Sequence, residues 1–283
     1  MFTLNCRGRL LTASRPLVMG IINVTPDSFY PGSRFAHRDQ ILAIAEKMLM
    51  DGASILDMGG QSTRPGAKQV GISEESVRVL DAIESVHHHF PEAFISVDTY
   101  HSSIAKGAVL AGASIINDVS GGTKDNDMLR VAALLNVPYI CMHMKGDPED
   151  MQLNPVYENL AMELLDYFFE RRNACKIAGI KDLIIDPGFG FGKTVRHNLE
   201  LISHLEIFRI LDCPIMIGIS RKSTIYKILG TGPEEALNGS TVLHTIGLLK
   251  GAGILRVHDV KEAVEAVKLV SAIGEEYSRK GAK

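Results

Sequence analysis

The apolar run Leu17-Val18-Met19-Gly20-Ile21-Ile22 stops abruptly at a polar residue, Asn23. Seven further short apolar runs end at a polar residue in the same way. They are 54–56 before Asp57, 94–97 before Asp98, 114–116 before Asn117, 137–142 before His143, 183–185 before Asp186, 215–219 before Ser220 and 253–255 before Arg256. Stretches with helical spacing separate the runs, so strand and helix alternate along the chain. This alternation predicts an α/β fold, the (β/α)8 TIM barrel.

In such a barrel the reacting groups lie at the carboxyl ends of the strands. The polar residues that end the apolar runs, which include Asn, Asp, Arg and His, occupy these positions. The sequence therefore predicts an enzyme with its site at one mouth of the barrel.

The length of 283 residues suits one barrel, since such barrels take roughly 250 residues. No linker rich in Pro, Gly or Ser interrupts the chain, so we expect a single domain over 1–283. Residues 2–12, with Gly8 between short apolar-rich flanks, are expected to form a hairpin that closes the bottom of the barrel.

Composition limits the possible partners and the compartment. The net charge of −3 gives no global attraction to nucleic acid or to an acidic membrane. The 4 cysteines are dispersed and form no Cys-x-x-Cys pair, which is typical of reduced thiols. The N-terminus lacks the apolar stretch of a signal peptide, and no apolar run is long enough to span a bilayer. We therefore expect a cytoplasmic protein.

The helical spacing gives a set of expected helices, and glycines mark several of their ends. The expected helices cover 39–50, 73–90, 101–110, 125–136, 155–178, 197–211, 222–249 with a break at 230–233, and 259–279. Gly52, Gly112, Gly179 and Gly251 are expected to stop the helices before strands 2, 4, 6 and 8. The long loops 23–38 and 59–72 are candidates for lids over the mouth.

The segment 186–194, Asp-Pro-Gly-Phe-Gly-Phe-Gly-Lys-Thr, is not a nucleotide motif. A phosphate loop needs glycine where Pro187 stands, and the dinucleotide fingerprint needs glycine where Lys193 stands. What remains is an acid at a strand end followed by a flexible loop that presents Phe191, an arrangement suited to a flat polar ring. The alternative is a glycine-rich turn with one capping aspartate.

Asp98, Asn117, Asp186 and Lys222 are expected to point into one mouth. A carboxylate accepts hydrogen bonds from an N–C–N edge, an amide donates and accepts, and an ammonium donates to a carbonyl. Together they match a guanine-like heterocycle such as a pterin. Each alone would be more typical of a helix cap, and the convergence of the set favours the binding site.

Two basic segments occupy the usual phosphate position of this fold. They are Ser220-Arg221-Lys222-Ser223 and Arg256-Val257-His258-Asp259, after strands 7 and 8. Arg64 supplies a further cation from the loop after strand 2. Solvated charges at a helix start are the alternative, which the pairing of the clusters on neighbouring strands disfavours.

The histidines carry weaker signals. His87, His88 and His89 end a helix, where cations suit the helix dipole, so a metal site is the less favoured interpretation. No His-x-His follows strand 1, which argues against a zinc hydrolase. His143 ends a strand, and it either lines the site or is a packing residue of the interior.

Seven motifs, in order within residues 16–265, closely resemble those of dihydropteroate synthase. They are 23–29 (NVTPDSF), 62–66 (STRPG), 96–99 (SVDT), 116–118 (IND), 186–193 (DPGFGFGK), 220–223 (SRKS) and 256–259 (RVHD). The resemblance implies a transferase that joins 6-hydroxymethyl-7,8-dihydropterin diphosphate to 4-aminobenzoate, releasing diphosphate and forming 7,8-dihydropteroate for folate. It also implies a homodimer, Mg²⁺ and a target of sulfonamides, which mimic the arylamine.

The resemblance implies the following site residues. Asp98, Asn117, Asp186, Lys222 and Arg256 would bind the pterin; Asn23, Thr63, Arg64, Arg256 and His258 the diphosphate; and Ser62, Thr63, Pro65, Phe191, Lys222 and Ser223 the aminobenzoate. Asn23 would bind Mg²⁺, and Asp98, Asp186, Lys222 and Arg256 would be catalytic. The chain departs from the family at Gln61, where Glu is common, and at 30–33, where Tyr-Pro-Gly-Ser replaces Ser-Asp-Gly-Gly.

These roles predict a dissociative, SN1-like substitution. Departure of diphosphate leaves positive charge on the pterin methylene, which Asp98 and Asp186 would stabilise before the neutral arylamine attacks. The alternatives are a methyltetrahydrofolate-binding methyltransferase, which has no use for the two basic segments, and a non-catalytic pterin-binding barrel.

Overall fold

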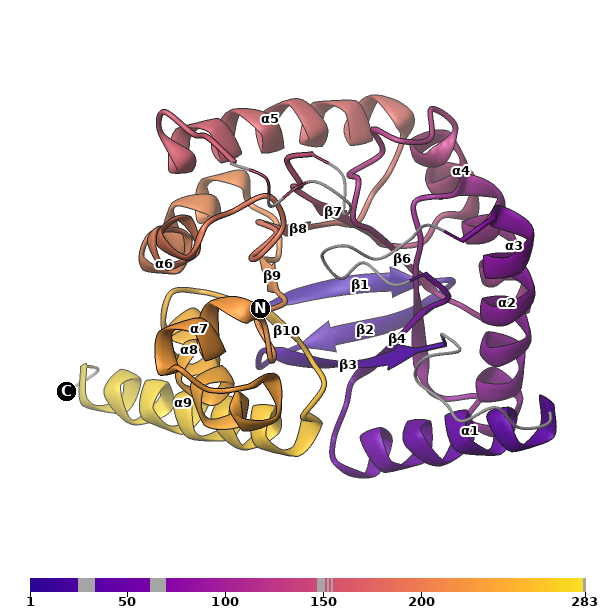
Figure 1. Ribbon diagram of the computed structural model, residues 1–283, viewed down its shortest axis with the longest axis horizontal. Coiled ribbons are helices and arrows are strands. Elements are labelled where there is room, and N and C mark those ends of the chain that lie inside the picture. The colour runs from indigo at the N-terminus through magenta and orange to yellow at the C-terminus, as the bar shows by residue number, and fades with distance from the viewer. Residues whose placement is uncertain (25–33, 62–69, 147–150, 152, 154, 282–283) are drawn as a thin grey trace.

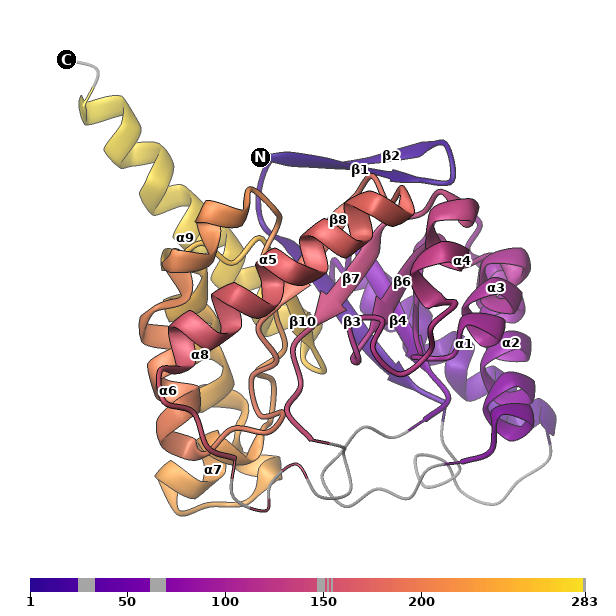
Figure 2. The same cartoon turned by 90° about the horizontal axis from the view of Figure 1, so that it is seen from above.

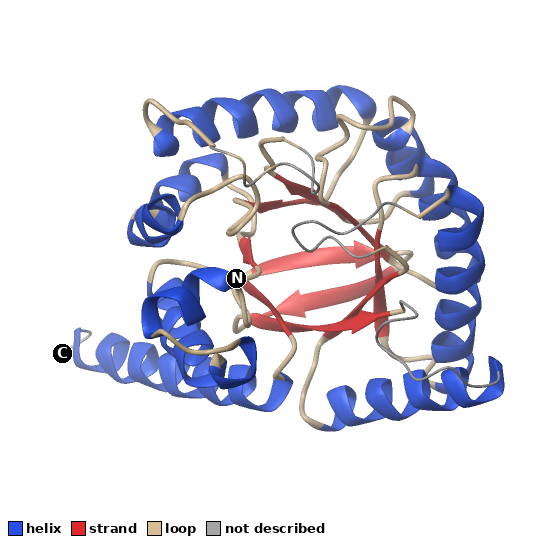
Figure 3. Ribbon diagram, in the orientation of Figure 1, coloured by secondary structure: helices blue, strands red, loops and turns tan. Residues whose placement is uncertain are grey.

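The computed structural model describes residues 1–24, 34–61, 70–146, 151, 153 and 155–281. Parallel strands form the wall of a barrel, and helices surround it (Figures 1 and 3). The strands of the wall are β3 (Leu17–Asn23), β4 (Ile55–Gly59), β5 (Phe94–Asp98), β6 (Ile115–Asp118), β7 (Tyr139–Met142), β8 (Leu183–Asp186), β9 (Met216–Ile217) and β10 (Ile254–Val257). This arrangement confirms the predicted (β/α)8 TIM barrel.

The strands are hydrogen-bonded in the order β8-β7-β6-β5-β4-β3-β10-β9. Between β8 and β9 the wall is joined by a single bridge that pairs Ile185 with Ile215, where the Ile185 N–H donates to Pro214 O at 3.0 Å. The barrel is therefore nearly closed, and its weakest seam lies beside β9. The strand expected over 215–219 is shorter than predicted, because only Met216 and Ile217 form the ladder with β10.

The helices follow the strands and pack around the wall. They are α1 (Arg34–Met50), α2 (Ile72–His89), α3 (Ser102–Ala111), α4 (Met128–Leu135), α5 (Leu160–Ala178), α6 (Val195–Ser203), α7 (Ser223–Leu229), α8 (Leu237–Leu249) and α9 (Val260–Gly281), with 3-10 helices η2 (Leu205–Leu211) and η3 (Pro233–Glu235). The predicted glycine stops are confirmed, since Gly52, Gly112, Gly179 and Gly251 all have positive φ. No helix within the described ranges is both long and apolar enough to cross a bilayer.

Some expected helix boundaries are wrong. The helix expected over 197–211 ends at Ser203, and Leu205, Phe208 and Leu211 continue it as a 3-10 helix because their spacing of three buries them on one side. The helix expected from 155 begins at Leu160, where the Asn159 side chain accepts a hydrogen bond from the Met162 N–H and caps it. The break expected at 230–233 is confirmed, since α7 ends there.

The expected N-terminal hairpin is confirmed: β1 (Phe2–Cys6) pairs antiparallel with β2 (Arg9–Ala13). Arg7 and Gly8 form its turn with φ of 56° and 86°, the left-handed pair that a tight two-residue hairpin requires. The hairpin lies across one end of the barrel (Figure 2). Leu4, Cys6 and Leu11 pack there against inward-facing residues of the wall, such as Met19 and Ile184, so the amino-terminal end of the barrel is plugged.

Candidate active site

Alternation of side chains along the strands builds the opposite mouth. Residues two apart on a strand face the same side, and four of the apolar residues that meet the hairpin are followed two positions later by a polar residue. The pairs are Ile55 with Asp57, Ile115 with Asn117, Ile184 with Asp186, and Ile254 with Arg256. The polar members therefore face the inside of the barrel, one layer nearer the carboxyl ends.

Arg256 connects this layer. Its Nε donates to Asp57 Oδ2 at 2.6 Å and its Nη2 donates to Asp98 Oδ2 at 2.6 Å. Asn117 Nδ2 donates to the same Asp57 oxygen at 3.1 Å. Burial raises the pKa of Asp98 to about 7, against the attraction of Arg256. Burial opposes the charge of Arg256 too, but Asp57 and Asp98 hold the pKa of Arg256 above its usual value.

Asp186 and Lys222 form the other side of the mouth. Burial raises the pKa of Asp186, with Lys222 opposing the shift. Burial lowers the pKa of Lys222 to about 7, with Asp186 again opposing. Gly218 lies on the wall between these residues and Arg256. If Gly218 carried a Cβ atom, that atom would lie 3.9 Å from the Cβ and Cδ of Arg256 and 4.0 Å from Asp186 Oδ2. The absence of a side chain there leaves space beside the charged groups.

The loop after β8 is held in one conformation. Gly188 has φ of 69°, and a Cβ on it would collide with the carbonyl of His143. The fully buried Lys193 donates through Nζ to Gly188 O at 3.0 Å and Phe191 O at 3.1 Å. The Phe191 ring thereby lies with its centroid 4.3 Å from Lys222 Nζ, which also donates to Phe189 O. An aromatic face and an ammonium are thus presented together.

His143 lies behind this loop. Its Nδ1 is 3.0 Å from Lys193 Nζ, and burial lowers the pKa of His143 to about 2. His143 is therefore a neutral packing residue that supports Lys193. His87, His88 and His89 end α2, and no group of three or more His, Cys, Asp or Glu residues within the described ranges is arranged to hold a metal ion.

The loops after β9 and β10 contact each other at the rim. His258 donates its backbone N–H to Ser220 Oγ at 3.1 Å, and its Nδ1 lies 3.1 Å from the same oxygen. Ser223 begins α7 directly after Lys222. Asn23 ends β3 and is paired in register with Gly59 of β4, so it belongs to the same carboxyl-end edge.

The structure thus brings Asp98, Asn117, Asp186, Lys222, Arg256, Phe191, Ser223, His258 and Asn23 to one end of the barrel. Ser62, Thr63, Arg64 and Pro65 lie outside the described residues, as do residues 25–33 and 62–69 of the loops 23–38 and 59–72 that are the candidate lids. The neighbouring Gln61 is buried, and its Oε1 accepts a hydrogen bond from the Val70 N–H at 2.8 Å, which joins the two ends of the loop.

Two buried acids were not predicted as site residues from the sequence. Asp57 lies at the centre of the network, and its Oδ1 has no hydrogen-bond partner. Glu75, in the first turn of α2, accepts from Thr99 Oγ1 at 2.7 Å, and burial raises the pKa of Glu75. Asp57 carries the same signal as the predicted residues, because it follows the inward Ile55 by two positions. Glu75 has no such signal.

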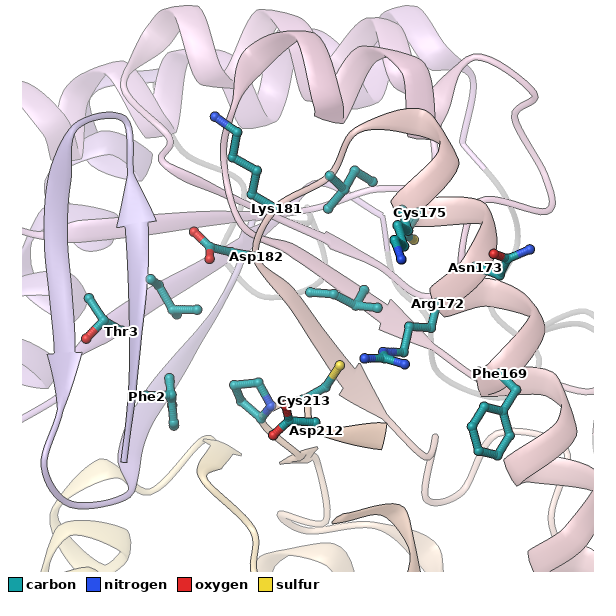
Figure 4. A pocket seen from close by; sticks show the side chains of 15 residues that line it. Phe2, Thr3, Phe169, Arg172, Asn173, Cys175, Lys181, Asp182, Asp212 and Cys213 are labelled. Atoms are coloured by element: carbon teal, nitrogen blue, oxygen red, sulfur yellow. The ribbon is translucent and has the colours of Figure 1, made fainter. Parts of the chain in front are cut away.

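A cavity of about 540 Å³ lies away from this mouth (Figure 4). It is lined by the hairpin residues Phe2 and Thr3, by Arg172 of α5, and by Asp182 and Asp212 beside the amino ends of β8 and β9. It contains none of the predicted site residues.

Comparisons with known proteins bear on this site. The family model "Pterin binding enzyme" matches residues 19–258. The chain is 43% identical to dihydropteroate synthase of Escherichia coli strain K12 over 270 residues, covering 94% of each chain. It resembles the structure of Xanthomonas albilineans dihydropteroate synthase with 4-aminobenzoic acid, at a TM-score of 0.90 and 40% identity, covering 96% of this chain and 98% of that one. It also resembles the structure of Yersinia pestis dihydropteroate synthase in a sulfonamide complex. The TM-score is 0.91 and the sequence identity 40%, and the match covers 97% of this chain and 100% of that one.

Proposed function

The chain belongs to the pterin-binding enzymes and, within them, to the dihydropteroate synthases, and we infer that it joins 6-hydroxymethyl-7,8-dihydropterin diphosphate to 4-aminobenzoate, releasing diphosphate. The resemblance drawn from the sequence motifs is thereby confirmed. The observation that carries the inference is the buried layer of Asp98, Asn117, Asp186, Lys222 and Arg256 at one mouth. Such a set of donors and acceptors has no role in packing a barrel, and it matches the edges of a pterin.

The pterin is assigned to the layer between Asp98 and Asp186. The carboxylate of Asp186 accepts from the N–C–N edge, Asn117 donates and accepts, and Lys222 donates to the ring carbonyl. The orphaned Oδ1 of Asp57 supports the assignment, because a buried acceptor without a partner gains from a ligand N–H.

The diphosphate is assigned to the rim formed by Arg256 and His258, with Thr63, Arg64 and Asn23 as further contacts. A guanidinium has five N–H donors, of which Asp57 and Asp98 take one each. Arg256 therefore retains donors for the leaving group while its carboxylate partners hold it in place.

Mg²⁺ is assigned to the diphosphate with Asn23 as its protein ligand. The donor set fits, because Mg²⁺ needs few protein ligands when substrate phosphates and water complete its coordination, and Asn23 offers an amide oxygen at the carboxyl end of β3. When bound, the ion would neutralise charge on the leaving group.

The aminobenzoate is assigned to the Phe191 side of the mouth. Phe191 provides a flat face, while Lys222 and Ser223 offer donors to a carboxylate. Ser62, Thr63 and Pro65 would complete this subsite. A sulfonamide, which mimics the arylamine, should compete for the same place, in keeping with the sulfonamide complex of the Yersinia pestis relative.

These assignments favour an SN1-like substitution. Arg256 and His258 stabilise the departing diphosphate, and Asp98 and Asp186 stabilise the positive charge left on the pterin methylene. The arylamine is neutral at physiological pH and needs positioning rather than a strong base. Asp98, Asp186, Lys222 and Arg256 are accordingly the proposed catalytic residues.

A homodimer is proposed for the assembled enzyme. Exposed apolar side chains are Leu199 on α6, Ile228 and Leu229 on α7, and Val242, Ile246 and Leu249 on α8, and α8 packs against both α6 and α7. Exposed apolar side chains on neighbouring helices support an interface there. A cytoplasmic location is proposed as well, on the support of four cysteines that are all free thiols.

The test is a diphosphate-release assay run with and without 4-aminobenzoate. We expect release that depends on both substrates, with 7,8-dihydropteroate formed in equal amount. A methyltetrahydrofolate-binding methyltransferase or a non-catalytic barrel would release none, and neither alternative is favoured by the comparisons.

A further inference from the structure

Arg221 has a strained backbone at the rim of the site. Its φ is 55°, a left-handed conformation that L side chains rarely adopt. The other non-glycine residues with positive φ in the described part of the chain are Arg7, in the hairpin turn, and Asn136 and Asp212, which end helical segments. These have ordinary local reasons for the conformation. Arg221 is the third residue of a turn closed by a hydrogen bond from the Lys222 N–H to Ile219 O at 3.1 Å, a position where positive φ is usually taken by glycine. Strain at a non-glycine residue is maintained where surrounding contacts enforce it.

The contacts of Arg221 connect three segments. Its Nε and Nη2 donate to the two carboxylate oxygens of Asp259 at 2.9 and 2.8 Å, a bidentate ion pair. Its Nη1 lies 3.4 Å from the carbonyl oxygens of Pro233 and Glu234 in η3. Its backbone N–H donates to Ser240 Oγ of α8 at 3.0 Å.

The two neighbours of Arg221 make contacts on the site side. Ser220 Oγ accepts from the His258 N–H, and Lys222 Nζ donates to Phe189 O beside the Phe191 ring. The partner of Arg221, Asp259, directly follows His258. One ion pair thus joins the loop that carries Lys222 to the loop that carries His258.

We propose that Arg221 is a positioning residue: its ion pair with Asp259 fixes the Lys222 loop against the His258 loop, so that the pterin and aminobenzoate contacts keep their distance from the diphosphate contacts. The proposal rests on the proposed function. It assigns no contact with substrate to Arg221.

The test uses three variants and a matched control. Arg221→Gly relieves the left-handed strain and removes the ion pair, Arg221→Lys keeps one charged donor without the bidentate geometry, and Asp259→Asn removes the partner's charge. The control is Arg130→Lys, since Arg130 makes an exposed pair with Asp127 on α4. For each variant, kcat and both KM values are measured by diphosphate release, and the folded fraction by thermal melting.

We expect kcat to fall on the order of ten-fold or more in Arg221→Gly, because small misplacements of reacting groups are costly. Arg221→Lys should recover part of the loss. Asp259→Asn should match Arg221→Gly, and the double variant should lose little more than either single variant, since both remove one contact. Arg130→Lys should behave as wild type.

A kcat per folded molecule that is unchanged in Arg221→Gly would overturn the proposal, as would fully additive losses in the double variant. These outcomes are distinct from failure of the proposed function. If the wild-type protein released no diphosphate, the reaction itself would be wrong, whatever Arg221 does.

Discussion

The two ends of the barrel are built from neighbouring positions on the same strands, yet their chemistry is opposite. At the amino-terminal end, Ile115, Ile184 and Ile254 pack against the hairpin and are fully buried. Two residues further on, Asn117, Asp186 and Arg256 are also buried or nearly so, but they are polar or charged. The first layer stabilises the fold through apolar burial. The second layer opposes the fold through desolvation, which the raised pKa of Asp186 and the lowered pKa of Lys222 both record.

This contrast separates residues that hold the barrel together from residues that perform the chemistry. Buried charges are costly unless they are paired, and Arg256 with Asp57 and Asp98 shows such pairing. Within this network Asp57 Oδ1 has no hydrogen-bond partner. Substitutions in the two layers should therefore have opposite effects on activity and stability.

The largest expected effect is on turnover. Arg256→Ala removes charge from the departing diphosphate, and Asp98→Asn removes charge from beside the pterin methylene. Each should lower kcat by about 10²–10³, the usual loss for a group that stabilises developing charge. Stopped assays of diphosphate at saturating substrates measure this, with Arg130→Lys as control. Unchanged kcat in both variants would reject the assigned roles.

Pterin affinity should be the next most affected property. Lys222→Ala leaves Asp186 without its neighbouring cation and the ring carbonyl without a donor. We expect affinity for the pterin substrate to fall about 100-fold, since a hydrogen bond from a charged donor contributes about 1.5–3 kcal/mol. Isothermal titration calorimetry measures this, and an affinity close to wild type would remove Lys222 from the pterin pocket.

The opposite layer should respond in stability alone. Ile184→Ala, two residues before Asp186, leaves a cavity beneath the hairpin and should lower the free energy of unfolding by about 2–5 kcal/mol. Urea denaturation measures this change. Turnover per folded molecule should stay at the wild-type value, and a loss of turnover comparable to that of Asp98→Asn would show that the two layers are not separable.

The smallest expected effect concerns pH. Burial lowers the pKa of Lys222 to about 7, from 10.5. The charged form that donates to the pterin is therefore lost above pH 7 in the empty site, and pterin affinity should decline there. Lys222→Arg keeps its charge at every accessible pH, so this alkaline decline should disappear even if affinity is lower overall. If pterin affinity still declined above pH 7 in Lys222→Arg, the decline would arise from a titratable group other than Lys222.

The same lowered pKa of Lys222 makes the free energy of unfolding depend on pH. Between about pH 7 and 10.5 the unfolded chain binds a proton on Lys222 that the folded protein does not. The contribution of this group to the free energy of unfolding therefore rises with pH across that interval and is lowest below pH 7. The slope should be reduced in Lys222→Met, as measured by urea denaturation at several pH values.

The strands were predictable because their pattern is local. Each apolar run ends at a polar residue, and the runs are separated by helical stretches, so β3 to β10 follow from periodicity and length alone. The boundary of the 3-10 helix 205–211 was not predictable, because apolar residues three apart fit both an α-helix and a 3-10 helix. The start of α5 was not predictable either, because the Asn159 cap depends on one side-chain hydrogen bond.

The candidate site was partly predictable for the same reason. Asp98, Asn117 and Asp186 each follow an apolar run directly, so their place at the mouth could be predicted. Asp57 also ends a run, but only its contact with Arg256, 199 residues away, reveals its place in the network. Glu75 is buried by the close approach of Gly60, and Lys193 by the left-handed turns of the loop after β8. Neither arrangement can be predicted from the spacing of residues in the sequence.

Pterin binding by Asp186→Asn separates a ligand-binding role of the buried polar layer from a structural one, because this substitution keeps the shape of the side chain and removes only its charge. The measurement is calorimetric titration with the pterin diphosphate, on protein whose free energy of unfolding is determined in parallel. We expect binding to be abolished while the free energy of unfolding stays within about 1 kcal/mol of wild type. Wild-type affinity together with a loss of stability like that of Ile184→Ala would show that Asp186 stabilises the fold and does not bind the pterin.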